Sequence, residues 1–235
     1  MFKFALTLAP ALPWFIAVLL IQPFTATNRS GPPLSLPAAA RRQLADNLVE
    51  SSTAISHVWR DVAPLNNDGT VNAYVEIARH DWRKWEFEIG LNMRAIDRVM
   101  PAELGGYPIN YGFVPQTISY DGDPFDALVL GPAIDGGTLV RGVIVGLMKM
   151  TDEKGLDSKV VVSLPGPDGR PIETLTEADR RRLADYFNAY KRHEAGKFSS
   201  VQGWDTAAQG LAFVQTTHTF FRECRRPDER CDLQK

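Results

Sequence analysis

The chain has 235 residues, of which 44% are hydrophobic, and its formal net charge at pH 7 is −2. This length suits one domain with appendages, and the apolar fraction is large enough to build a core. The near-neutral charge argues against a protein that works by gripping nucleic acid, which requires a basic face.

The N-terminal segment has the pattern of an export signal. Residues 4–24 are nearly all apolar and are preceded only by Lys3 and the amino terminus. This order of charge, apolar run and polar sequence is typical of a secretory signal. The run is also about as long as the ~20 residues that span a bilayer. We therefore expect residues 1–27 to be a signal peptide or a membrane anchor, with cleavage slightly favoured, and the protein to be periplasmic or secreted rather than cytoplasmic.

A linker and a helical extension follow over residues 28–56. The polar, proline-bearing stretch 28–37 forms the linker. Residues 38–59 are predicted to be helical, and the apolar members of this stretch are Leu44, Leu48, Ile55 and Val58.

Two strands are predicted next, over residues 71–78 and 84–89, because apolar and polar residues alternate in both. In the first, Val71, Ala73, Val75 and Ile77 share one face, and Asn72, Tyr74 and Glu76 share the other. In the second, Trp85, Phe87 and Ile89 lie opposite Lys84, Glu86 and Glu88. Taken in isolation, the two strands form an amphipathic hairpin with a solvated charged face.

Three carboxylates crowd the loop of residues 121–126, Asp-Gly-Asp-Pro-Phe-Asp, just before an apolar run at 127–130. Carboxylates this close resist ionisation beside one another, and a hard cation with oxygen ligands, Mg²⁺ or Ca²⁺, is the usual reason for such crowding. Gly122 and Pro124 suit a tight, stiff turn. On this stretch alone, a metal site and a solvated acidic turn fit equally well, whereas an EF-hand does not fit the order of residues.

The remaining elements are three strand-like runs and two helices. Strands are predicted at 127–130, 139–150 and 159–164, with a second acidic turn at 152–157. The Tyr- and Phe-rich stretch 107–113 indicates core or sheet packing. A helix is predicted to begin near Thr176, with Asp179 as a capping partner, and to place Leu183, Phe187 and Tyr190 on one face. A final helix over residues 205–224 would direct Leu211, Val214, His218 and Phe221 inward, with His218 a structural residue rather than a ligand.

The only two cysteines, Cys224 and Cys231, lie in the C-terminal tail of residues 223–235. Two lone cysteines make a poor zinc site. Their spacing permits a local disulfide in an oxidising compartment, which agrees with the export pattern.

The loop Asp121-Gly122-Asp123-Pro124-Phe125-Asp126-Ala127 resembles the signature of the soluble (family I) inorganic pyrophosphatases, and further blocks agree in the same order. These blocks are Val75-Glu76-Ile77, Lys84-Trp85-Glu86, Asp97-Arg98, Tyr107-Pro108-Ile109-Asn110-Tyr111-Gly112, Lys149-Met150-Thr151-Asp152-Glu153, Asp157-Ser158-Lys159, Tyr190-Lys191, Gly196-Lys197 and Gly203-Trp204. The resemblance places a catalytic domain at residues 57–222.

The resemblance implies a mainly β (α+β) fold, a five-stranded OB-like closed β-barrel with flanking helices. It implies Mg²⁺-dependent hydrolysis of pyrophosphate to two phosphates by a metal-activated water. Carried over by position, Asp121, Asp126 and Asp157 would hold the activating metal, and Asp152 and Glu76 would join Asp157 in holding metals that arrive with substrate. Asp123 would be the general base, and Glu86 would order metal-bound water. The phosphate contacts would be Lys84, Arg98, Tyr111, Lys159, Tyr190 and Lys191.

Some features depart from the usual family pattern. Export and the cysteine-bearing tail are both unusual for the family. Residues 57–62 resemble the longer, eukaryote-type members, so a homo-oligomer is expected but dimer and hexamer both remain open.

Three other functions compete with this interpretation. The chain could be an exported metal- or phosphate-binding member with little activity, or a broader metal-dependent phosphatase. An OB-type nucleic-acid binder would need a basic, aromatic groove, which the overall charge does not support.

Overall fold

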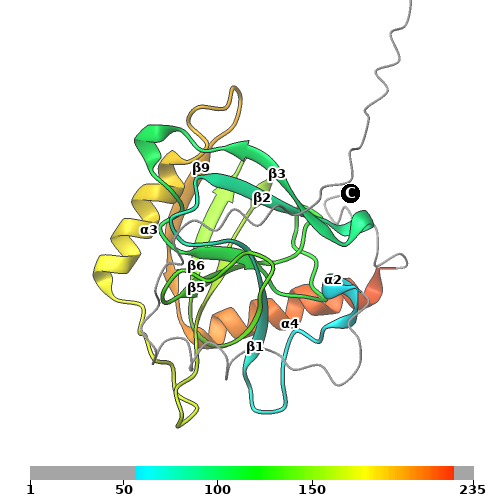
Figure 1. The fold of residues 1–235 in the computed structure, drawn as a ribbon. Coiled ribbons are helices and arrows are strands. Elements are labelled where there is room, and N and C mark those ends of the chain that lie inside the picture. Colours follow the sequence, from blue (N-terminus) through cyan, green and yellow to red (C-terminus); the bar gives the residue numbers. More distant parts are fainter. Residues whose placement is uncertain (1–56, 225–235) are drawn as a thin grey trace, which may run out of the picture. The chain divides into compact units, whose positions relative to one another are not determined.

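The computed structural model describes residues 57–224, which form a mainly β fold with two long helices (Figure 1). The expected export segment, linker and helical extension up to residue 56, and Cys231, lie outside the described residues. The strands are β1 (Val71–Ile77), β2 (Arg83–Glu88), β3 (Met93–Val99), β4 (Asn110–Phe113), β5 (Asp126–Leu130), β6 (Leu139–Asp152), β7 (Gly155–Leu156), β8 (Lys159–Ser163) and β9 (Ser199–Asp205). The helices are α2 (Val58–Asp61), α3 (Glu177–Ala189) and α4 (Ala207–Glu223), with short 3₁₀ turns at η1 (Ile89–Leu91) and η2 (Ala102–Leu104).

The larger sheet is organised around the long strand β6. Its strand order is β1-β4-β5-β8-β6-β7, and β6 pairs in addition with β9 and with β1. The path β1-β4-β5-β8-β6 therefore returns to β1. Of these pairings only β5–β8 is parallel. Parallel pairing places the N-terminal ends of β5 and β8 at the same edge of the sheet, and both acidic segments of the sequence lie beside that edge.

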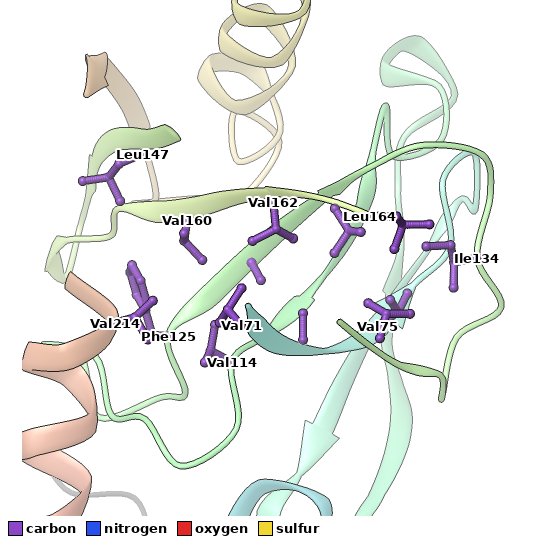
Figure 2. Close-up of a cluster of buried hydrophobic side chains, with 14 residues drawn as sticks. Val71, Val75, Val114, Phe125, Ile134, Leu147, Val160, Val162, Leu164 and Val214 are labelled. Carbon is purple, nitrogen blue, oxygen red and sulfur yellow. The ribbon is translucent and has the colours of Figure 1, made fainter. Parts of the chain in front are cut away.

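The predicted apolar face of β1 is buried as expected. Val71 and Val75 pack in a cluster with Val160 and Val162 of β8 and with Val214 of α4 (Figure 2). This cluster has no access to solvent at any of these five residues. The β-branched side chains suit a pleated sheet because their restricted rotamers pack well against neighbouring strands.

The polar face of β1 differs from the expectation of a solvated hairpin. Asn72 and Glu76 are buried as well, and β1 does not pair with β2. Instead β2 pairs with β3 in a separate two-stranded sheet. Phe87 of that sheet packs onto Tyr74 and donates its backbone N–H to Glu76 Oε1 at 2.6 Å. The small sheet therefore covers Tyr74 and Glu76, whereas Asn72 is held by the segment before β1, where its side chain donates to the carbonyl of Ala63 at 2.8 Å.

Two strands have no clear signal in the sequence. In β3 most side chains are exposed, and its Met-Arg-Ala-Ile-Asp-Arg-Val sequence shows no two-residue alternation of apolar and polar character. In β9 the Ser-Ser-Val-Gln-Gly-Trp-Asp sequence is equally irregular. Both strands form because a neighbouring strand offers an unpaired edge: β2 pairs with β3, and the C-terminal half of β6 pairs with β9.

Both long helices begin at capping boxes. The side chain of Thr176 accepts from the backbone N–H of Asp179, whose side chain bonds back, as the sequence predicted. Thr206 and Gln209 repeat this arrangement at α4. That helix therefore begins after residue 205, which belongs to β9, so the predicted start was slightly early. Such a cap satisfies backbone donors that a helix start otherwise leaves unpaired.

The C-terminal helix α4 packs closely on β6 and β8 (Figure 1). His218 is structural, as expected, since its Nδ1 lies 2.7 Å from the carbonyl oxygen of Gln116. Cys224 follows the helix and is not a free thiol. Because Cys231 is outside the described residues, the disulfide stays a prediction. Within residues 57–224 no helix is long and apolar enough to cross a membrane.

Gly210 allows the close approach of α4, and this yields a prediction. A Cβ at this position would lie 2.9 Å from Ile144 Cγ2 and 3.0 Å from the carbonyl oxygen of Gly146. Alanine normally stabilises a helix by ~1 kcal/mol relative to glycine. We expect Gly210→Ala to lower the free energy of unfolding by about 1–2 kcal/mol, because the overpacking cost exceeds that gain. Urea unfolding measures the change, and a more stable variant would contradict the packing described here.

Candidate active site

The first acidic loop is shaped by backbone hydrogen bonds and ends at β5. Asp121 Oδ1 accepts the backbone N–H of Asp123 at 3.1 Å. Gly122 has φ +86°, a conformation that other residues adopt at a cost. Its N–H bonds to the carbonyl of Ser119 at 3.0 Å, and the N–H of Ser119 bonds to the carbonyl of Asp123 at 2.6 Å. The loop is therefore a compact turn that presents two carboxylates just before Asp126, the first residue of β5.

The second acidic segment comes to the same edge through sheet register. Asp152 ends β6, Asp157 follows the short strand β7, and Lys159 begins β8. Since β5 and β8 are parallel, with Ala127 opposite Val160, the carboxylate of Asp126 lies beside Asp157 and Lys159. Residues more than thirty positions apart in the chain therefore meet because of one strand pairing.

A single pocket unites nearly all of the predicted site residues. Those that line it are Glu76, Lys84, Glu86, Tyr111, Asp121, Asp123, Asp126, Asp152, Asp157, Tyr190 and Lys191. Aromatic side chains, among them Trp85, Phe87 and Tyr107, form much of the remaining wall. Of the predicted set, Lys159 and Arg98 lie outside this lining.

Lys159 does not line the pocket, but it contacts two residues that do, Asp126 and Asp157. Its Nζ is 2.5 Å from Asp126 Oδ2 and 2.8 Å from Asp157 Oδ1, and its side chain is only 1% exposed. The ammonium group also lies 5.5 Å from the centre of the Tyr111 ring. Burial alone would lower the pKa of Lys159, but the carboxylates of Asp126 and Asp157 raise that pKa well above its ordinary value. The lysine is therefore charged inside the protein.

Arg98 lies at the rim, tied to the pocket through carboxylates. Its guanidinium pairs with Asp97 at 2.9 Å and with Glu194 at 2.7 Å. Asp97 in turn accepts from Lys84 Nζ at 3.2 Å, and Lys84 also bonds to Glu86. Arg98 and Lys84 are thus linked in one network of charges.

Lys191 places an ammonium group in the pocket next to Asp152. Lys191 Nζ is 2.5 Å from Asp152 Oδ2 and 3.2 Å from Glu153 Oε1. Tyr111 and Tyr190 stand nearby, and burial raises the pKa of both phenols well above the ordinary value. Both tyrosines are therefore neutral hydrogen-bond donors at physiological pH.

Crowding of the carboxylates is visible in their proton affinities. Burial, together with the negative charge of Asp126, raises the pKa of Glu76 well above its usual range. Burial raises the pKa of Asp157 to about 7, with Asp126 and Asp152 acting in the same direction and Lys159 opposing them. Such groups are stabilised in their charged form when a nearby positive charge is added.

The donor set suits a hard metal ion. The described residues that line the pocket offer carboxylate oxygens and include no histidine or cysteine, which is the ligand chemistry of Mg²⁺ and Ca²⁺. Within residues 57–224, no three carboxylate, imidazole or thiol groups converge as a ready-made metal site. Ammonium groups stand between the carboxylates instead, so a metal ion would take over the charge balance that Lys159 and Lys191 now provide.

The structure adds site residues to which the sequence analysis gave no role. Lys154 Nζ lies 3.5 Å from Asp123 Oδ2, and Glu153 and Glu194 hold Lys191 and Arg98. Glu153 and Lys154 belong to the second acidic turn, and that acidic turn is the sequence feature that could have identified them as site residues. Glu194 lies in a polar loop after α3, and its partner is far away in the sequence, so only the fold reveals it.

Comparison with known proteins agrees with this geometry. The family model for inorganic pyrophosphatase matches residues 73–222. The inorganic pyrophosphatase of Rickettsia felis is 34% identical over 161 residues, which are 65% of this chain and 91% of that protein. That of Saccharolobus solfataricus is 33% identical over 147 residues, 59% of this chain and 84% of that protein.

Solved structures are similar as well. An inorganic pyrophosphatase from Coxiella burnetii has a TM-score of 0.63 and 32% identity, covering 68% of this chain and 99% of that chain. One from Thermus thermophilus has a TM-score of 0.64 and 30% identity, covering 70% and 99%. These likenesses confirm the expected OB-like, mainly β fold with a few helices. Because the family model matches residues 73–222, more than half of the chain, this chain belongs to the inorganic pyrophosphatase family.

Proposed function

We propose that the pocket between the two acidic segments is the site at which this chain hydrolyses inorganic pyrophosphate to two phosphates, with Mg²⁺ as the metal. Pyrophosphate hydrolysis follows from the family. The observation that carries the assignment to this pocket is that carboxylates, ammonium groups and neutral phenols from distant segments converge in it. Phosphoryl transfer depends mainly on positioning and on stabilisation of negative charge, and this set of groups serves both.

The metal ligands we propose are Asp121, Asp126 and Asp157 for the activating ion, with Asp152 and Glu76 joining Asp157 for ions that arrive with substrate. The support is their mutual repulsion, since burial and neighbouring carboxylates disfavour the charged forms of Asp157 and Glu76. When bound, Mg²⁺ ions neutralise phosphate oxygens and acidify a water molecule. Glu86, which faces the pocket beside Lys84, would order such water.

Asp123 is proposed as the general base. Asp123 lines the pocket, and the bond from its backbone N–H to Asp121 Oδ1 fixes its backbone in the loop. A carboxylate within hydrogen-bond reach of the attacking water accepts a proton as the new phosphorus–oxygen bond forms.

The phosphate-binding groups we propose are Lys84, Arg98, Tyr111, Lys159, Tyr190 and Lys191. Arginine grips phosphate through two parallel hydrogen bonds. For Arg98 to do so, phosphate must replace the carboxylates of Asp97 and Glu194 that now hold it. The neutral phenols of Tyr111 and Tyr190 would donate hydrogen bonds without adding charge.

The proposal extends to the whole chain. The return of the strand path to β1 supports the closed five-stranded barrel. We propose a catalytic domain at 57–222, an export segment or membrane anchor at 1–27 that makes the enzyme periplasmic or secreted, a linker and helical extension at 28–56, and a disulfide-bearing tail at 223–235. A homo-oligomer is the proposed assembly.

Asp123→Asn tests the general base. We expect the rate of phosphate release to fall by roughly 10²–10⁴-fold, because the water loses its proton acceptor. The Mg²⁺ affinity should stay near that of the wild type, since Asp123 is not among the proposed ligands. Phosphate release and calorimetric Mg²⁺ titration measure the two effects, and an equal loss of Mg²⁺ binding would reassign Asp123 to the metal.

Asp126→Asn tests the metal ligands. We expect Mg²⁺ affinity and activity to fall together, because the substitution removes a carboxylate that is shared between the ion and Lys159. Asp168→Asn is the matched control: Asp168 sits in an exposed turn and accepts the backbone N–H of Arg170, a bond that asparagine retains. An unchanged Mg²⁺ dependence in Asp126→Asn would remove Asp126 from the ligand set.

A further inference from the structure

Lys154 places a positive charge over the first acidic loop from a different part of the chain. It lies in the two-residue turn between β6 and β7. Its Nζ is 3.5 Å from Asp123 Oδ2 and 3.7 Å from Asp121 Oδ2. All three side chains line the same pocket. The proposed mechanism has given this lysine no task.

The ion pairs of Lys154 with Asp121 and Asp123 are longer and more exposed than those of two other lysines of the site. Lys159 and Lys191 approach their aspartates to 2.5 Å, with side chains 1% and 12% exposed. The Lys154 side chain is 50% exposed, and its distances to carboxylate oxygens are about one ångström longer. Exposed pairs of this kind contribute little and are screened by salt. These two ion pairs are therefore easier to break than those of Lys159 and Lys191.

The backbone of Lys154, in contrast, is firmly placed. Its N–H donates to Asp152 Oδ1 at 2.7 Å, while Lys191 binds the other oxygen of the same carboxylate. Gly155 follows with φ +115°, which lets the two-residue turn close. This backbone position places the Lys154 ammonium within 3.7 Å of both Asp121 and Asp123.

We propose that Lys154 competes with the divalent cation at Asp121 and so sets the metal concentration at which the site fills. The ammonium lies 3.7 Å from Asp121 Oδ2 and 3.5 Å from Asp123 Oδ2. Because the ammonium and a divalent cation repel each other, an ion that binds Asp121 must displace the ammonium. In the metal-free protein the same ammonium offsets the repulsion between the two carboxylates. This inference rests on the proposed function, because it takes Asp121 as a metal ligand.

The test is calorimetric titration of the EDTA-treated full chain with MgCl₂, comparing the wild type with Lys154→Met. We expect the Kd for Mg²⁺ to fall by about three- to tenfold, the scale of a partly screened charge pair. The difference should shrink as KCl is raised, because salt screens an exposed charge. Lys154→Arg keeps the charge and should bind Mg²⁺ as the wild type does.

Lys149→Met is the matched control. Lys149 lies on β6, the strand before the turn that holds Lys154. Its side chain is 43% exposed and pairs with Asp205 Oδ1 at 3.3 Å, but it does not line the pocket. The change in net charge is identical, so its Kd should stay at the wild-type value. Unchanged or weaker Mg²⁺ binding in Lys154→Met would overturn the inference, as would equal tightening in Lys149→Met.

Failure of this inference is distinct from failure of the proposed function. If the wild type binds Mg²⁺ and releases phosphate while Lys154→Met has the same Kd, only the role of Lys154 is wrong. A wild type that neither binds Mg²⁺ nor releases phosphate would overturn both.

Discussion

The site depends on a buried ammonium group held between two carboxylates. Lys159 is inaccessible to water, and its Nζ lies within 2.8 Å of both Asp126 and Asp157. A buried charge costs several kcal/mol unless it is paired, and breaking such a pair leaves an uncompensated charge. The parallel register of β5 and β8, with Ala127 opposite Val160, brings the three groups together. The charge balance of the site therefore depends on the register of β5 and β8, because a shift of either strand would separate Lys159 from Asp126.

Lysines also lie beside the other carboxylates at this end of the sheet. These lysines differ in exposure, since the side chain of Lys159 is 1% exposed, that of Lys191 12% and that of Lys154 50%. We propose that Lys159 and Lys191 contact phosphate once metal ions take their place beside the carboxylates. Stability and catalysis would then depend on the same groups. Arg98, held by Asp97 and Glu194, follows the same pattern at the rim.

Local signals in the sequence predicted local structure well. The strand predicted from alternation at residues 71–78 and the helix start predicted from Thr176 and Asp179 depend on neighbouring residues, and both elements are confirmed. The solvated polar face expected for the first strand was wrong, because Asn72 and Glu76 are buried. The convergence of the predicted site came from the ordered motifs of the family. Features that depend on partners far along the chain were missed. β3 and β9 exist because β2 and β6 offer unpaired edges, and the burial of Glu76 depends on coverage by the small sheet. Glu194 likewise has a partner almost a hundred residues away, which no local pattern encodes.

The most direct test of pyrophosphate hydrolysis is phosphate release from pyrophosphate by the full chain, with Mg²⁺ titrated and EDTA as the control. We expect release that rises with Mg²⁺ to saturation, stops with EDTA, and far exceeds release from a nucleotide or a phosphomonoester. Folded protein that binds Mg²⁺ yet releases no phosphate from pyrophosphate would contradict it. The pocket would then serve binding rather than hydrolysis.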